Sequence, residues 1–226
     1  MKVFERPGPV NTDEIIQIAR LAASQCRHMV VASVTGDSAV KLKGALGDRD
    51  VVCVTCPRGM SWETGKMTEG PFASIPELKR IRNEWLKQGL TRVPMEITRE
   101  NRERLDKLKV KIVQGTIPLF GPTFSMRLHL QKTTDLDLMA KTLELISTGT
   151  LVCLEAVLMS VDAGALPEGE EVIALAGTER GLDTAWVLRA CASHNLFHPA
   201  KGMRFIELLA KPGLAAIPDV NIPYLR

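Results

Sequence analysis

The sequence lacks a long hydrophobic run, is poor in aromatic residues and carries no strong excess of either charge. Its longest apolar stretch, LVCLEAVLMSVDAGAL at 151–166, contains Glu155 and Asp162 and is too short to cross a bilayer. The first residues, MKVFERPGPVNTDE, are polar and include prolines, which argues against a secretory signal. A net charge of +3 over 226 residues does not by itself indicate nucleic acid. We therefore expect no membrane partner.

Cysteine is also scarce, and the five thiols are scattered along the chain. An odd number fits reduced thiols in the cytoplasm better than a disulfide framework. Cys53 and Cys56 have C-x-x-C spacing, but Cys53 falls within a predicted strand and no second ligand pair is present. We expect structural thiols and no metal site. The stretch GMSWETGKM is one residue too long for a P-loop, and Met67 replaces its Ser or Thr.

Residues 79–111 contain eleven Lys or Arg and five Asp or Glu, a local surplus of +6. Aromatic side chains, on which nucleic-acid bases stack, are nearly absent from this segment. We interpret it as a solvated helical face rather than a nucleic-acid surface, with phosphate steering as the alternative.

Hydrophobic residues, at 45% of the chain, alternate between strand-like and helix-like patterns. Strands that alternate with helices predict an α/β fold of three layers with a mainly parallel sheet, in one domain over 1–226. Capping boxes are predicted at Asn11 with Glu14 and at Ser74 with Glu77. A loop is expected at 57–75 and an irregular tail at 212–226. The predicted strands are 28–34, 50–55, 110–115, 170–177, 185–191 and 205–211, and the predicted helices are 11–27, 37–46, 74–89, 98–108, 136–147 and 151–164.

Two loops rich in glycine and hydroxyl residues, SVTGDS and GTERGLDT, each follow a predicted buried strand. The first N–H groups of a helix have no internal partner, so they bind phosphate, and glycine allows close approach of the backbone. Arg180 adds a cation. The alternative is ordinary turn and cap chemistry. We favour a shared anion site made of Ser33, Thr35, Gly36, Asp37, Ser38, Gly177, Thr178, Arg180, Gly181, Asp183 and Thr184.

The segments HMVVASVTGDSAVKLKGALGDRDVVCVT and LPEGEEVIALAGTERGLDTAWVLR resemble the C-terminal domain of pyruvate kinase. The motifs FERPGPVNT and VASVTG, with residues 153–198, are similar to a stand-alone family of pyruvate kinase C-terminal-domain-like proteins. The resemblance implies that family's fold and a phosphorylated small ligand held by the two loops, and flavin mononucleotide (FMN) is associated with the family. No catalytic barrel domain is present, so pyruvate kinase activity is not implied.

Four further residues are candidates for the site. His194 and Asn195 follow a predicted strand within ASHNLFH, Glu155 lies in an apolar helix, and Glu5 belongs to the first family motif. The chain is expected to be a ligand-binding or regulatory protein. The alternatives are an enzyme, flavin-dependent or otherwise, that transfers protons through His194 or Glu155, or a structural subunit whose loops are only turns. The other partner expected is a second copy of the chain, in a homo-oligomer.

Overall fold

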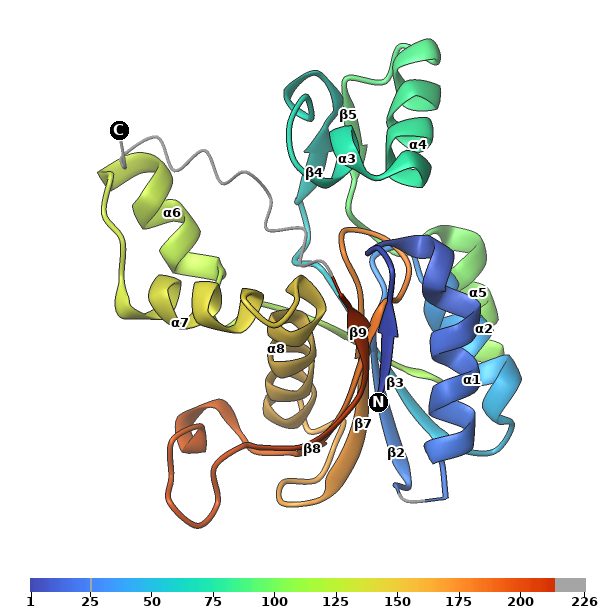
Figure 1. Cartoon of the computed structure of the whole chain (residues 1–226), viewed down its shortest axis with the longest axis vertical. Coiled ribbons are helices and arrows are strands. Elements are labelled where there is room, and N and C mark those ends of the chain that lie inside the picture. Colours follow the sequence, from blue (N-terminus) through green and yellow to red (C-terminus); the bar gives the residue numbers. More distant parts are fainter. Residues whose placement is uncertain (25, 214–226) are drawn as a thin grey trace.

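A computed structural model describes residues 1–24 and 26–213 of the chain. Its centre is a seven-stranded sheet in the order β1-β9-β8-β7-β2-β3-β6 (Figure 1). All neighbouring strands pair in parallel except β8, which is antiparallel to both β7 and β9. The mainly parallel sheet predicted from the sequence is confirmed. The strands are β1 (Lys2–Phe4), β2 (His28–Ala32), β3 (Asp50–Thr55), β6 (Lys111–Gln114), β7 (Glu171–Ala176), β8 (Thr184–Arg189) and β9 (Arg204–Pro212).

Helices cover both faces of the sheet and complete three layers (Figure 1). One face carries α1 (Thr12–Ala22), α2 (Asp37–Leu46) and α5 (Arg99–Lys107), and the other carries α8 (Thr148–Asp162). Beyond α8 lie α6 (Gly121–Leu130) and α7 (Asp135–Glu144). Along β2, Met29 and Val31 enter the core under α1 and α2, whereas Val30 enters the core under α8. Because both faces are buried, every residue of β2 after His28 is apolar.

A small subdomain, residues 57–96, stands above the carboxyl end of the sheet, and we call it the cap (Figure 1). It contains β4 (Ser61–Glu63), a 3-10 turn (Thr64–Lys66), α3 (Pro71–Ser74), α4 (Pro76–Lys87) and β5 (Arg92–Pro94). Its own core consists of Trp62, Phe72, Ile75 and Leu78. The prediction of a loop over 57–75 was therefore wrong, because three-residue strands are too short to show periodicity.

Both predicted capping boxes are also wrong. The Asn11 side chain donates hydrogen bonds to the carbonyls of Arg6 and Gly8 instead of capping α1. Glu77 instead accepts two hydrogen bonds from Arg6, at 2.7 and 3.0 Å, and ties the cap to the segment after β1. For Asn11 the competing partners are nearby carbonyls, whereas for Glu77 the partner is distant in sequence.

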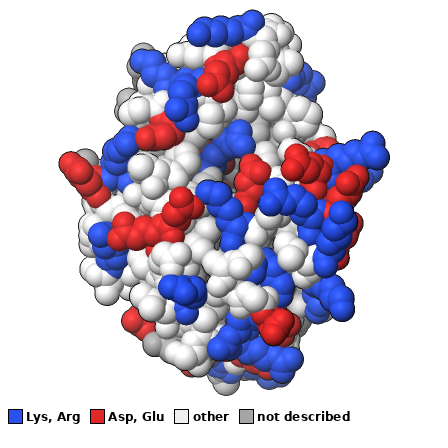
Figure 2. All heavy atoms as spheres, turned by 90° about the vertical axis from the view of Figure 1, so that its right-hand side faces the viewer, with Lys and Arg blue, Asp and Glu red and all other residues white. Residues whose placement is uncertain are grey.

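The predicted tail lies outside the described residues from position 214 onward. No helix within the described part of the chain is long and apolar enough to cross a membrane. On the outer face of the α1, α2 and α5 layer, Lys and Arg side chains intermingle with Asp and Glu (Figure 2). Arg99 pairs with Glu103 and Arg104 with Glu100 along α5, as expected of a solvated helical face.

Candidate functional site

The two loops predicted to bind an anion emerge side by side from the carboxyl edge of the sheet. The first follows β2 and the second follows β7, and these strands are parallel neighbours. The chain leaves β2 toward β3 on one side and leaves β7 toward β8 on the other, so the loops diverge and leave a crevice between them. Arg180 Nη2 lies 3.5 Å from Asp37 Oδ2 across this crevice. The structure thus brings both loops to one place.

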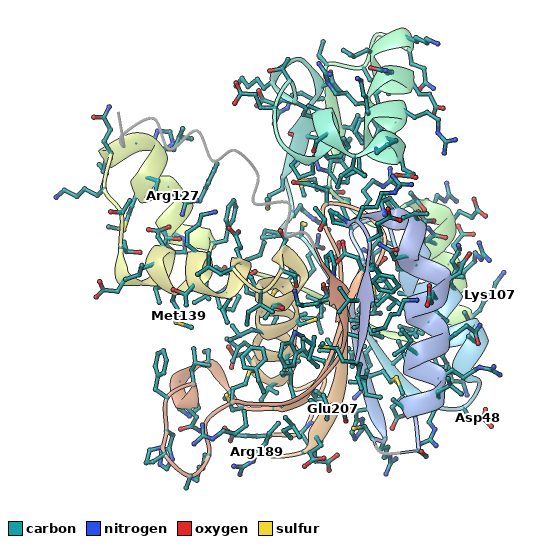
Figure 3. All side chains as sticks on the ribbon, viewed as in Figure 1. Asp48, Lys107, Arg127, Met139, Arg189 and Glu207 are labelled. Atoms are coloured by element: carbon teal, nitrogen blue, oxygen red, sulfur yellow. The ribbon has the colours of Figure 1, made fainter. Side chains whose placement is uncertain are left out.

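A cavity of about 770 Å³ occupies this edge, and we call it the edge cavity. It extends from the helical layer of α2 to the opposite layer of α8, where Arg127 on α6 also lines it (Figure 3). The cap closes its upper side. The lining includes Ser33, Thr35, Asp37, Ser38 and Lys41 near α2, Met60, Ile81 and Met95 from the cap, Arg104 and Asn101 from α5, Gly177, Glu179, Arg180 and Gly181 from the β7–β8 loop, and Leu119, Arg127, Asp137, Lys141, Glu144, Leu151 and Glu155 on the α8 side.

At the α2 end, the polar groups suit an anion. Ser33 and Ser38 are buried residues that line the cavity, and their hydroxyls make no side-chain hydrogen bond within the described chain. The first backbone N–H groups of α2 have no partner inside the helix and carry partial positive charge. Lys41 also lines this end, although it pairs with Asp13.

Gly36 has a different role from the close ligand approach that we predicted. Its φ of +88° places it in the left-handed region, where it caps α2. A Cβ atom there would lie 2.9 Å from Asn101 Cβ and 3.2 Å from Ile97 Cγ2. Gly36 is therefore required by the turn and by the packing of α5, and it is not among the residues that line the cavity.

Asn101 holds the first loop in place and was not predicted as a site residue. Its side-chain amide donates to the Thr35 carbonyl at 2.9 Å and to Asp37 Oδ1 at 2.7 Å. The Thr35 hydroxyl lies 2.6 Å from Asp37 Oδ2 and donates to it. Helical spacing of four residues from the buried Leu105 was the one signal in the sequence that placed Asn101 on the inner face of its helix.

Asp183, Thr178 and Thr184 support the second loop from behind and do not line the cavity. The Asp183 carboxylate accepts hydrogen bonds from the backbone of Gly8 at 2.9 Å and of Thr178 at 3.1 Å, and from the Thr184 hydroxyl at 2.9 Å. A Cβ on Gly181, whose φ is +75°, would lie 2.5 Å from Pro9 Cα. These residues fix the loop against the segment that follows β1, so they position the site.

The remaining residues of this loop join the cavity to the cap. The Arg180 guanidinium lies 5.8 Å from the Trp62 ring centre and 5.9 Å from that of Trp85, a cation–π arrangement. Trp62 Nε1 donates to Glu179 Oε2 at 3.2 Å. The Glu179 side chain is exposed toward the cavity, and partial desolvation by the protein around it raises its pKa.

At the α8 end, Glu155 is 7% exposed and faces the cavity. Its Oε1 accepts a hydrogen bond from the Leu119 backbone N–H at 3.3 Å. Burial raises the pKa of Glu155 to about 7, the Leu119 hydrogen bond opposes the rise, and the nearby charge of Glu144 adds to it. Glu155 can therefore both give and take a proton near neutral pH.

The structure does not bring the other predicted residues into the edge cavity. His194 and Asn195 follow β8, which runs antiparallel, so they lie at the opposite edge of the sheet. Asn195 donates to Glu168 there, and His194 lines a separate, smaller cavity of about 370 Å³. Glu5 is exposed beside Arg6 and does not line the edge cavity.

The thiols and carboxylates do not form a metal centre of three or more ligands within residues 1–24 and 26–213. All five cysteines are free. Burial raises the pKa of Cys53 to about 12 and that of Cys56, which lines the cavity, to about 11. No protein-family model matches this chain.

Proposed function

We propose that the protein binds a phosphorylated small molecule in the edge cavity, with the phosphate at the amino end of α2. The observation that carries this proposal is the convergence of the Ser33 and Ser38 hydroxyls, the α2 N–H groups and Arg180 on one end of one cavity. Hydroxyl and backbone donors with a guanidinium are the groups that bind phosphate in proteins.

Asp37 lies at the same end of the cavity, and its negative charge would repel a phosphate unless neighbouring groups neutralise it. Both of its carboxylate oxygens already accept hydrogen bonds, from Asn101 and from Thr35. Arg180 Nη2 lies 3.5 Å from Asp37 Oδ2, and no hydrogen bond between the two side chains is found within the described residues. A guanidinium has five N–H donors, so most remain for a phosphate. Asp37 thus orients Arg180 for the ligand.

FMN is the ligand that we favour, and the resemblance to the pyruvate kinase C-terminal-domain-like family supports it. Apolar side chains from the cap, Met60, Ile81 and Met95, face Leu119 and Leu151 across the cavity, as a flat ring requires. Ser38 and Arg180 would hold the phosphate. A bound flavin would supply redox chemistry.

A second candidate function is an enzyme in which Glu155 transfers a proton. The observation that favours it is a nearly buried carboxyl that faces the cavity. His194, the other proton-transfer candidate from the sequence, has no such support because it lies at the opposite edge of the sheet.

Calorimetric titration with FMN tests the binding proposal. Arg180→Ala and Ser38→Ala should weaken FMN binding, by about tenfold or more for Arg180, because a hydrogen bond to a charged group contributes about 1.5–3 kcal/mol. Lys107→Ala removes an exposed cation on α5 outside the cavity and should have no effect (Figure 3). Riboflavin, which lacks the phosphate, should bind more weakly than FMN. Equal affinity of wild type and Arg180→Ala would contradict the proposal.

A further inference from the structure

The two ends of the edge cavity offer opposite chemistry. At the α2 end, hydroxyls, helix N–H groups and Arg180 point to an anion. At the α8 end, the Glu155 carboxyl lines the cavity beside two ion pairs, Arg127 with Asp137 and Lys141 with Glu144. These ends belong to helical layers on opposite faces of the sheet (Figure 1). A ligand that reaches both ends therefore meets two different subsites.

Glu155 has one oxygen available to a ligand. Oε1 accepts from the Leu119 N–H, and Oε2 has no hydrogen-bond partner within the described residues. No fully buried side-chain oxygen in this part of the chain lacks a partner. Oε2 must therefore be open to the cavity that Glu155 lines. Glu155 is thus almost completely buried and has one oxygen available to a ligand, as a residue of a binding site would be.

Each cation around Glu155 is paired with a carboxylate, so the two ion pairs at this end are neutral overall. From α6, Arg127 pairs with Asp137, and on α7 Lys141 pairs with Glu144. Cys56, which directly follows β3, and Glu179 on the β7–β8 loop also line this part of the cavity, and neither is a cation. Among the described lining residues, carboxyl groups here outnumber cations, because Arg127 and Lys141 stand beside Asp137, Glu144, Glu155 and Glu179, so a second phosphate would meet an excess of carboxyl groups.

The walls around Glu155 favour its neutral form. Leu119, Leu151, Ala156 and Met159 line the cavity beside it, and an apolar environment penalises a carboxylate. With its pKa raised to about 7, a large fraction of Glu155 is protonated at neutral pH. A protonated carboxyl donates one hydrogen bond through its O–H and still accepts at its other oxygen.

We propose that Glu155 forms a second subsite of the edge cavity, which binds an uncharged hydrogen-bonding group of the ligand, such as a ring carbonyl or an amide, and disfavours a second phosphate. The inference rests on the proposed function. It narrows the ligand to a monophosphate whose far end is a neutral polar ring, of which FMN is an example, and it separates that class from sugar bisphosphates.

Calorimetry with FMN from pH 7 to 9 tests this subsite. The second ionisation of a phosphate ester lies near about 6, so the charge of the ligand phosphate is constant over this range. FMN affinity should fall as the pH rises, because Glu155 loses the proton that it donates. Glu155→Gln, which keeps a neutral donor, should bind FMN with little dependence on pH. Glu155→Ala should bind about three- to tenfold more weakly than Glu155→Gln at pH 7, the equivalent of one hydrogen bond.

Two controls make the outcomes distinct. Glu207→Gln changes an exposed carboxylate on β9, far from the cavity, and should follow the wild type at every pH (Figure 3). Fructose 1,6-bisphosphate should bind the wild type more weakly than FMN. The subsite is refuted if Glu155→Ala, Glu155→Gln and wild type bind FMN alike, or if the bisphosphate binds more tightly than FMN. Loss of FMN binding in Arg180→Ala together with unchanged Glu155 variants would refute the subsite alone. A wild type that binds neither compound would refute both proposals.

Discussion

Glu155 illustrates, at the scale of the single residue, how a binding group reduces the stability of the fold. A carboxyl with a pKa near 4.5 in the unfolded chain and about 7 in the folded protein binds its proton more tightly when folded. Its effect on the free energy of unfolding is absent below about pH 4.5, because both states are then protonated. As the pH rises from 4.5 to 7, the unfolded state ionises first and the protein loses stability.

Glu155→Gln should therefore stabilise the protein, and increasingly so at higher pH. The gain should be small near pH 4.5 and approach about 3 kcal/mol above pH 7, because the pKa of Glu155 rises from 4.5 to about 7 on folding. Urea unfolding of both proteins between pH 4.5 and 8 measures it. Glu207→Gln, an exposed change, should give no comparable trend. A constant difference between Glu155→Gln and wild type across this range would contradict the shifted pKa.

Residue types in the two loops were predictable, but the direction of each side chain was not. Ser33 and Ser38 line the cavity as expected, whereas Thr178 and Asp183 turn inward. What decides between these roles is a partner distant in sequence, such as the Gly8 backbone for Asp183. No local pattern contains that information.

At the scale of the element, α2 contains two glycines with opposite effects. Gly36 fixes the start of the helix, whereas Gly44 weakens its interior. Its bounds, Asp37–Leu46, agree with the prediction, as do those of β3, because a buried strand is apolar throughout and a glycine turn begins the helix. By contrast, α6 and the strands of the cap were missed because their apolar residues show no clear period.

The two glycines of α2 should respond oppositely to alanine. Gly36→Ala places a Cβ 2.9 Å from Asn101 Cβ at a φ of +88°, so it should cost about 1–3 kcal/mol of stability. Gly44 is an exposed residue within the helix, and a Cβ there would meet nothing within 4 Å. Gly44→Ala should gain about 0.5–1 kcal/mol. Thermal unfolding of the two variants checks both signs, and a neutral Gly36→Ala would show that the turn tolerates a side chain.

At the scale of the whole molecule, the edge cavity is lined by residues from both helical layers, from the two loops and from the cap. The two loops come from the segments quoted for the resemblance to the pyruvate kinase C-terminal domain, whereas the cap and α6 lie within residues 57–135, outside those segments. The meeting of the two loops at one edge of the sheet was therefore predictable from the sequence. The opposite wall depends on how residues 57–145 pack over the sheet, which neither motif nor periodicity revealed.

Because both helical layers and the cap line one cavity, a ligand in it should stabilise the molecule as a unit. FMN at 100 times its dissociation constant should add about 2.7 kcal/mol to the free energy of unfolding. For a chain of this length, that corresponds to a rise in melting temperature of about 5–10 °C. Differential scanning calorimetry should show one transition that moves upward with FMN and moves less with riboflavin at the same concentration.

The number of thermal unfolding transitions shows whether the cap unfolds together with the rest of the molecule. The cap is tied to the rest of the chain through Arg6 with Glu77, and through Arg180 beside Trp62 and Trp85. Those contacts are sufficient, together with a ligand between cap and sheet, to make unfolding cooperative. A separate transition for the cap that FMN leaves in place would show that the cap does not contact the ligand, and the apolar wall assigned to Met60, Ile81 and Met95 would then be wrong.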